Sequence, residues 1–163
     1  MPGLTAWAAE GRPVATEITS YPKSTLTPTP RPEVIVDADG VLEAINNPNA
    51  QMLNALSRDQ HEGRGRVYGR PGRVAGSVCL TTADLFSAET GRFLPPGEIA
   101  ARFADIGAKP GERYVAYCGG GIAASATTFL LTLLGHDDVA LYDNSLGEWS
   151  VREDLQMETG ASD

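Results

Sequence analysis

A cysteine followed by three glycines is the part of this chain best suited to chemistry. Cys118 ends the apolar run Tyr114–Tyr117, and Gly119, Gly120 and Gly121 separate it from a helix-forming stretch. Glycines let the backbone curl until successive N–H groups converge, and the positive end of the next helix points at the same place. Because such a setting favours a thiolate, we expect Cys118 to be a nucleophile in an anion-binding cradle. Six residues would supply the cradle backbone: Gly119, Gly120, Gly121, Ile122, Ala123 and Ala124.

Other cysteine chemistries fit this loop less well. A cysteine phosphatase needs an arginine about six residues after the nucleophile, but Ala124 stands there and the next arginine is Arg152. A thioredoxin-type site needs a second cysteine where Gly121 stands. A cysteine with a histidine base remains open, since His61 and His136 are present without a local signature.

Dinucleotide binding is a further alternative. Gly119, Gly121 and Ala124 form a G-x-G-x-x-A fingerprint after a predicted strand, and Asp143 ends the next strand. That interpretation leaves Cys118 without a role. Transfer of sulfur through a cysteine persulfide instead uses both the thiol and the backbone cradle, and it needs neither an arginine nor a metal.

Composition narrows the class of partner. The 163 residues carry a net charge of −8, which disfavours nucleic acid and anionic membranes as partners. Two cysteines make no disulfide framework, and with two histidines they make no convincing zinc site. No apolar run approaches the length of a membrane span and the N-terminus lacks a signal pattern. We therefore expect a cytoplasmic protein with no metal and no cofactor.

The chain divides into two segments, residues 1–32 and residues 33–163. The first contains a short helical piece and a stretch rich in Thr and Pro that favours extended backbone. The second alternates strands and helices, which predicts an α/β fold with a mainly parallel sheet of about five strands and helices on both faces. Strands are expected at 51–56, 74–80, 114–118 and 139–142, and helices at 37–45, 95–106, 123–134 and from about 145.

Several motifs in order resemble the rhodanese-type sulfurtransferases. The loop Tyr117–Ala123 resembles the family's CGSGV-like active-site loop, Arg70–Val78 its PGHIPGA segment, and Val139–Trp149 its C-terminal signature. The resemblance implies sulfur transfer from 3-mercaptopyruvate or thiosulfate to a thiol or cyanide through Cys118. Because residues 3–14 resemble the end of such a domain, it also implies a tandem protein. Residues 1–32 would then be the tail of an upstream domain plus a linker, packing against that domain or self-associating, and residues 33–163 the catalytic domain.

The departures from the family pattern concern substrate binding. Asn54 and Leu56 stand where the family has the acid and arginine of "DAR", and Arg73 replaces the histidine of "GHIPG". Gly120 replaces a serine and Ala123 a Thr or Arg, so side-chain donors are lost. We expect Arg58 or Arg73 to compensate and Asn54 to lie at the substrate site. The alternative is a rhodanese-fold binding or scaffold domain with little or no catalysis.

Residues outside the loop receive simpler interpretations. Cys79 and Trp149 are expected to pack, while His61 and His136 are expected at the surface. Asp143 and Glu148 would shape the site rim or cap a turn. Five arginines in a glycine-rich segment form either a solvated loop or a basic rim that attracts an anion: Arg58, Arg64, Arg66, Arg70 and Arg73.

Overall fold

A five-stranded parallel sheet forms the centre of the fold in the computed structural model, which describes residues 3–65 and 68–161. All neighbouring strands run parallel, in the order β1-β6-β5-β2-β4. The strands are β1 (Ile35–Val36), β2 (Ala50–Asn54), β4 (Val78–Cys79), β5 (Arg113–Tyr117) and β6 (Val139–Tyr142). The predicted α/β class with about five mainly parallel strands is confirmed.

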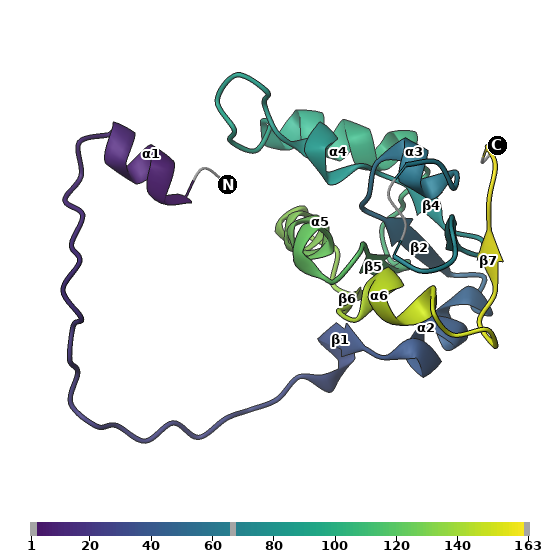
Figure 1. The fold of residues 1–163 in the computed structure, drawn as a ribbon, viewed down its shortest axis with the longest axis horizontal. Helices are drawn as coiled ribbons and strands as arrows, with labels where there is room; N and C mark the ends of the chain where they lie inside the picture. Colours follow the sequence, from purple (N-terminus) through teal and green to yellow (C-terminus); the bar gives the residue numbers. More distant parts are fainter. Residues whose placement is uncertain (1–2, 66–67, 162–163) are drawn as a thin grey trace.

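Side chains of the central strand β5 point alternately into two cores. Tyr114 and Ala116 pack into one, and Val115 and Tyr117 pack into the other, with all four fully buried. Alternation follows from the two-residue period of a strand, and a strand buried on both faces needs apolar residues throughout. Helices therefore cover both faces of the sheet (Figure 1). One face carries α4 (Pro96–Asp105) and α5 (Ile122–Leu133), and the other carries α2 (Ala38–Ile45) and α6 (Ser145–Trp149).

Helix boundaries follow local signals. The Asp37 side chain accepts the Gly40 N–H at 3.0 Å and caps α2. Prolines open α4, and Ile99 and Phe103 on its inner face are buried. Ala100, the residue after Ile99, is exposed. Two short elements complete this part of the chain: α3 (Arg58–His61) and the 3₁₀ turn η2 (Thr82–Leu85).

The strand predicted over residues 74–80 is in fact two strands. β3 (Arg73–Val74) pairs antiparallel with β7 (Met157–Glu158) in a separate small sheet, whereas β4 joins the central sheet. A turn divides them, because Gly76 has φ +72° and the Ser77 hydroxyl donates to the Val74 carbonyl at 2.7 Å. The apolar run alone does not reveal this turn.

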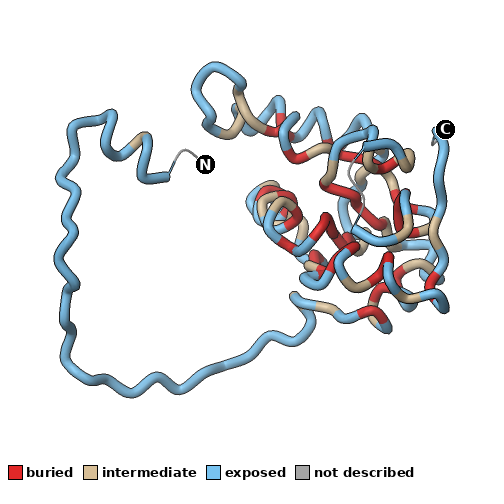
Figure 2. Tube along the Cα trace, viewed as in Figure 1, coloured by how far each residue is buried: buried red, intermediate tan, exposed pale blue. Residues whose placement is uncertain are grey.

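The N-terminal segment extends away from the sheet and its helices. Helix α1 (Gly3–Ala9) is followed by residues 10–31, which form no helix or strand and are exposed (Figures 1 and 2). The chain rejoins the fold at the 3₁₀ turn η1 (Pro32–Val34). An ion pair of 2.8 Å between Glu10 and Arg92 ties the α1 end to the loop before α4. Among the described residues, no helix has the length and apolar character that crossing a bilayer requires.

Candidate active site

Cys118 lies at the carboxyl end of β5, between the ends of two neighbouring strands. β5 is flanked by β2 and β6, so the loop after it lies where ligands bind in parallel sheets. Cys118 is 3% exposed, while Gly120 two residues later is exposed. A reactant would therefore approach the thiol from the Gly120 side of the loop.

Ser145 holds this loop in place. Its hydroxyl oxygen accepts the N–H groups of Cys118 at 3.0 Å and Gly121 at 3.2 Å, and its O–H donates to the Tyr142 carbonyl at 2.7 Å. Ser145 is fully buried and has φ +52°, a left-handed conformation that is rare for serine. Such strain in a buried, fully bonded residue is typical of functional sites. The sequence did not indicate this role.

The N-terminus of α6 completes the support. The Leu146 N–H donates to the Cys118 carbonyl at 3.1 Å, and the Gly147 N–H donates to the Gly119 carbonyl at 2.9 Å. These bonds turn the first two carbonyls of the loop towards α6. A negatively charged group on the sulfur is therefore kept apart from those carbonyl oxygens.

Four backbone N–H groups of the loop remain available. Within the loop, the Ile122 N–H bonds the Gly120 carbonyl at 3.0 Å, and Gly121 is bound by Ser145. In the described part of the chain, the other four have no partner: those of Gly119, Gly120, Ala123 and Ala124. Free N–H groups at a helix N-terminus are suited to an anion. The predicted cradle residues thus divide into four that can bind and two that hold the loop together.

The three glycines of the loop differ in whether a side chain could replace their hydrogen. Gly121 has φ +77°, and a Cβ there would overlap the Asp143 carboxylate. Gly119 does not have a positive φ, but a Cβ there would overlap the Tyr68 ring and hydroxyl. Gly120 has neither restriction, because a Cβ there would meet nothing within 4 Å. Only one of the three therefore needs glycine for its backbone conformation.

Asn54, expected at the substrate site, is buried and hydrogen-bonded within the fold. It is fully buried, its side-chain oxygen accepts the Leu56 N–H at 3.0 Å, and its amide nitrogen lies 3.1 Å from His61 Nδ1. The expectation of a surface His61 is wrong, since the residue is fully buried and its Nε2 has no partner. Burial, with the nearby charge of Arg73, lowers the pKa of His61 to about 4. The other histidine, His136, is half-buried and packs edge-on against Tyr114.

Arg73 is also used structurally. It is 6% exposed, and its guanidinium donates to the Gly160 carbonyl at 2.8 Å and pairs with Glu158 at 3.4 Å. Arg70 bonds four backbone carbonyls at and just after the C-terminal end of α6, including those of Arg152 at 2.5 Å and Leu155 at 2.8 Å. These two side chains therefore do not form an exposed basic rim.

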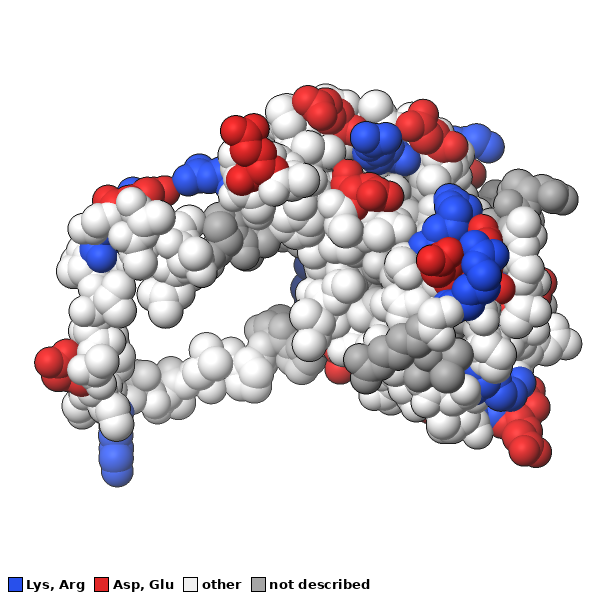
Figure 3. Space-filling model, turned by 45° about the horizontal axis from the view of Figure 1, so that its top comes forward, with Lys and Arg blue, Asp and Glu red and all other residues white. Residues whose placement is uncertain are grey.

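Arg58 and Arg64 are the other arginines of that segment whose positions the structure describes. Arg64 pairs with Asp59 and Glu62, and the position of Arg66 lies outside the described residues. Figure 3 shows Lys and Arg interspersed with Asp and Glu on the face it presents. Arg58 is exposed and lines a cavity of about 200 Å³ beside Cys79. Burial raises the pKa of the Cys79 thiol, which agrees with the predicted packing role.

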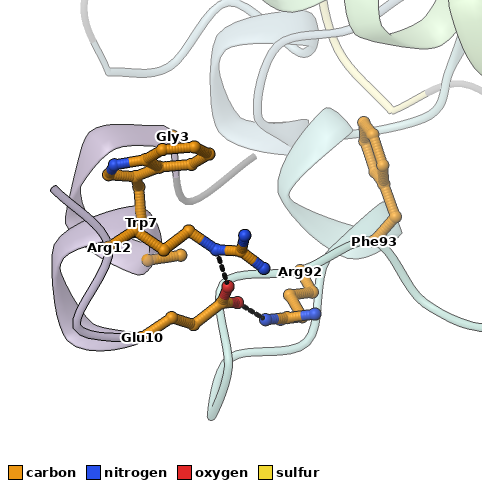
Figure 4. Close-up of a pocket in the computed structure, with 7 residues that line it drawn as sticks. Gly3, Trp7, Glu10, Arg12, Arg92 and Phe93 are labelled. Carbon is orange, nitrogen blue, oxygen red and sulfur yellow. Dashed lines mark hydrogen bonds and ion pairs between the residues drawn. The ribbon is translucent and has the colours of Figure 1, made fainter.

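One cavity has no Cys118 in its lining. It measures about 600 Å³ and lies between α1 and the loop before α4, where Trp7 and Phe93 face it (Figure 4). Glu10 bonds Arg12 at 2.7 Å and Arg92 at 2.8 Å at its edge. Its lining contains no cysteine, serine or histidine. The Cys118 loop therefore remains the candidate active site.

Further side chains near the site have packing or capping roles. Trp149 is fully buried, as predicted, and Glu148 accepts hydrogen bonds from Tyr142 and Asn144. Asp143 lies against Gly121 at the loop. The described residues contain no cluster of three or more His, Cys, Asp or Glu that could hold a metal ion.

Known proteins are similar to this chain over most of its length. A family model described as "Rhodanese-like domain" matches residues 37–152. A probable 3-mercaptopyruvate sulfurtransferase of Pseudomonas aeruginosa is 29% identical over 160 residues, covering 97% of this chain and 56% of the relative. A putative thiosulfate sulfurtransferase of Mycobacterium tuberculosis is 31% identical over 170 residues, covering 98% of this chain and 60% of the relative. The chain thus spans a little over half the length of these relatives.

Solved structures share the fold. The anaerobic ergothioneine biosynthesis enzyme from Chlorobium limicola, in complex with trimethyl histidine, superposes with a TM-score of 0.85 at 22% identity. The match covers 98% of this chain and 40% of that enzyme. At this identity the similarity extends to the fold.

Proposed function

This chain belongs to the rhodanese-like domain family, and we propose that it transfers sulfane sulfur through a persulfide on Cys118. The donor would be a small anion, 3-mercaptopyruvate or thiosulfate, and the acceptor a thiol or cyanide. The observation that carries the proposal is the position of Cys118 beside four N–H groups, at the start of α5, that have no partner among the described residues. Relatives named as sulfurtransferases support the same chemistry.

The proposed reaction has two balanced steps. The Cys118 thiolate attacks the outer sulfur of thiosulfate or the thiol sulfur of 3-mercaptopyruvate, and a new S–S bond forms. The S–S bond of thiosulfate or the C–S bond of 3-mercaptopyruvate breaks. The leaving group takes the electron pair, as sulfite from thiosulfate or as an enolate that gains a proton to give pyruvate. The acceptor then attacks the terminal sulfur and releases the Cys118 thiolate.

The protein contributes charge stabilisation and position. The N–H groups of Gly119, Gly120, Ala123 and Ala124 can bind the persulfide anion, and preorganised donors of this kind need no rearrangement during the reaction. Ser145 fixes the loop that carries them. No side-chain base is required if the thiol is already deprotonated.

Sulfur transfer to cyanide tests this proposal. With either donor, the chain should produce thiocyanate, and Cys118→Ser should abolish production. Cys79→Ser is the matched control, because Cys79 is buried against Leu56 and Thr81 away from the loop. Equal activity in the wild type and Cys118→Ser would contradict a Cys118 persulfide.

A binding or scaffold domain is the second candidate function. Leu56 occupies the expected arginine position and packs against both cores, while Asn54 is buried. These residues supply no charged group to a donor. If the folded wild-type chain produced no thiocyanate from either donor, this candidate would be favoured.

We also propose that residues 1–32 lead from an upstream rhodanese domain that packs on the outer face of α5. Ile122, Phe129 and Leu133 are 87%, 52% and 63% exposed along that face. The extended segment lies on the same side of the fold as α5 (Figure 1), and the relatives are longer than this chain. Light scattering of the chain should show a monomer. A dimer that Phe129→Lys dissociates would instead identify a second copy as the partner.

A further inference from the structure

A small cavity with charged walls lies at the edge of the central sheet that β4 forms. It measures about 200 Å³, and none of residues 118–124 lines it. Its charged residues come from three elements: Arg58 from α3, Asp84 from η2, and Arg102 and Asp105 from the last turn of α4. The proposed sulfur transfer gives no role to this site, which we call the mixed-charge cavity.

The four charged side chains of this cavity do not neutralise one another. In the described part of the chain, no ion pair involves Arg58, Asp84, Arg102 or Asp105. By contrast, Arg64, another exposed arginine of the same region, pairs with two carboxylates. Two positive and two negative side chains therefore surround one cavity and keep their charges available to a ligand.

The Cys79 thiol lies within the field of both signs of charge. Burial is the main cause that raises the pKa of this thiol. Of the charges that line the cavity, Arg58 lowers the same pKa and Asp84 raises it. Opposite charges therefore act on the same small space beside the thiol.

The buried part of the lining is apolar. Cys79 and Leu80 are 6% and 5% exposed, and Ile106 is half-buried. The Cys79 thiol and the Thr81 hydroxyl donate to the Leu56 carbonyl, at 3.6 Å and 3.1 Å. Because these polar hydrogens are used within the fold, this part of the lining offers a ligand apolar contact.

We propose that the mixed-charge cavity is a second binding site of this chain, for the zwitterion of a short aliphatic α-amino acid. The carboxylate of the ligand pairs with Arg58 and Arg102, and its ammonium group pairs with Asp84 and Asp105. The cavity has the volume of about seven water molecules at ~30 Å³ each, so it admits a ligand the size of alanine and excludes a nucleotide. A ligand with a single charge would leave one pair of charged side chains unpaired, which favours the zwitterion.

NMR titration of the isotope-labelled chain with L-alanine tests this site. L-alanine should shift the amide signals of Cys79, Leu80 and Ile106, with a dissociation constant on the order of 1 mM or below. Propionate, which lacks the ammonium group, and ethylamine, which lacks the carboxylate, should each bind at least about tenfold more weakly. No shift with L-alanine, or equal affinity for either single-charge analogue, would overturn the proposal.

Variants that remove one charge test whether binding occurs in this cavity. Arg58→Met and Asp105→Asn should each weaken L-alanine binding by about fivefold. Arg12→Met is the matched control, because Arg12 is exposed and does not line the cavity. Cys118→Ser should bind L-alanine as wild type does, so the result does not depend on sulfur transfer. Unchanged affinity in both Arg58→Met and Asp105→Asn, with their folds intact by thermal unfolding, would overturn the assignment to this cavity.

Discussion

The Ser145 hydroxyl accepts the backbone N–H of Cys118 at 3.0 Å, so the first residue of α6 fixes the residue we propose as nucleophile. The same oxygen accepts the Gly121 N–H at 3.2 Å. One buried side chain therefore holds both ends of the four-residue loop. The chemistry of the loop depends on a contact between segments 27 residues apart.

Replacing Ser145 by alanine should weaken both stability and sulfur transfer. Ser145→Ala leaves two buried N–H groups without an acceptor and keeps the left-handed backbone, so the free energy of unfolding should fall by roughly 2–4 kcal/mol. Ser145→Gly is the matched control, since it loses the hydroxyl but tolerates the positive φ and should cost less. Urea unfolding measures the free energy of unfolding of both variants. Equal stability of Ser145→Ala and wild type would contradict the role of the hydroxyl.

Replacement by alanine should destabilise the fold at Gly121 but leave its stability nearly unchanged at Gly120. Gly121→Ala places a Cβ against Asp143 at φ +77°, so it should cost about 1–3 kcal/mol of unfolding free energy. Gly120→Ala meets nothing within 4 Å and should change stability by less than about 0.5 kcal/mol. Thermal or urea unfolding compares the pair directly. Similar losses at both positions would show that this loop conformation is wrong.

Stability should fall below neutral pH because of His61. Burial and the charge of Arg73 lower the pKa of folded His61 to about 4, from 6.5. Between these values the unfolded chain binds a proton that the folded chain does not, so stability decreases as pH falls from 6.5 to 4. The loss would be at most about 3 kcal/mol.

Urea unfolding at several pH values measures this dependence, with His61→Gln as the control variant. Glutamine does not titrate, so the slope between pH 4 and 6.5 should be shallower in His61→Gln than in wild type. Glu62 and Glu158 act on His61 in the opposite direction and are unchanged in this variant. Identical slopes would assign the pH dependence to other groups.

Removing the Arg70 guanidinium should loosen the end of α6. Its hydrogen bonds to four carbonyls would be lost in Arg70→Met, with an expected cost of roughly 2–4 kcal/mol. Arg58→Met is the control, because Arg58 is exposed and should contribute less than about 0.5 kcal/mol. Urea unfolding compares the two. If Arg70→Met lost no more unfolding free energy than Arg58→Met, the Arg70 guanidinium would not stabilise this region.

The sequence predicted the position of the cysteine–glycine loop and most of the sheet because those signals are local. The apolar run before Cys118, the glycines after it and the Asp37 cap of α2 lie within a few residues of what they determine. The parallel direction of the strands was predicted because strands alternate with helices along the chain. The turn at Gly76 was missed because an apolar run hides a break in a strand.

The residues around the loop could not be predicted because their roles depend on distant contacts. The sequence did not predict that Tyr68 lies against the loop, because its contact with Gly119 forms only in the folded chain. Arg73 was expected at a substrate site, yet the folded chain uses its guanidinium to bond backbone carbonyls. His61 was expected at the surface, but the short helix α3 places it against buried Asn54. A pattern of residue types cannot distinguish an arginine that binds a ligand from an arginine that donates hydrogen bonds to backbone carbonyls.

Mass spectrometry of the intact chain after exposure to sulfur donors tests the central proposal most directly. Incubation with 3-mercaptopyruvate or thiosulfate should add about 32 Da, the mass of one sulfur atom, and a thiol reductant should remove it. Peptide mapping should place the added sulfur on Cys118, and Cys79→Ser should still acquire it. An adduct on Cys79 alone, or no adduct in the folded wild type with either donor, would contradict sulfur transfer through Cys118.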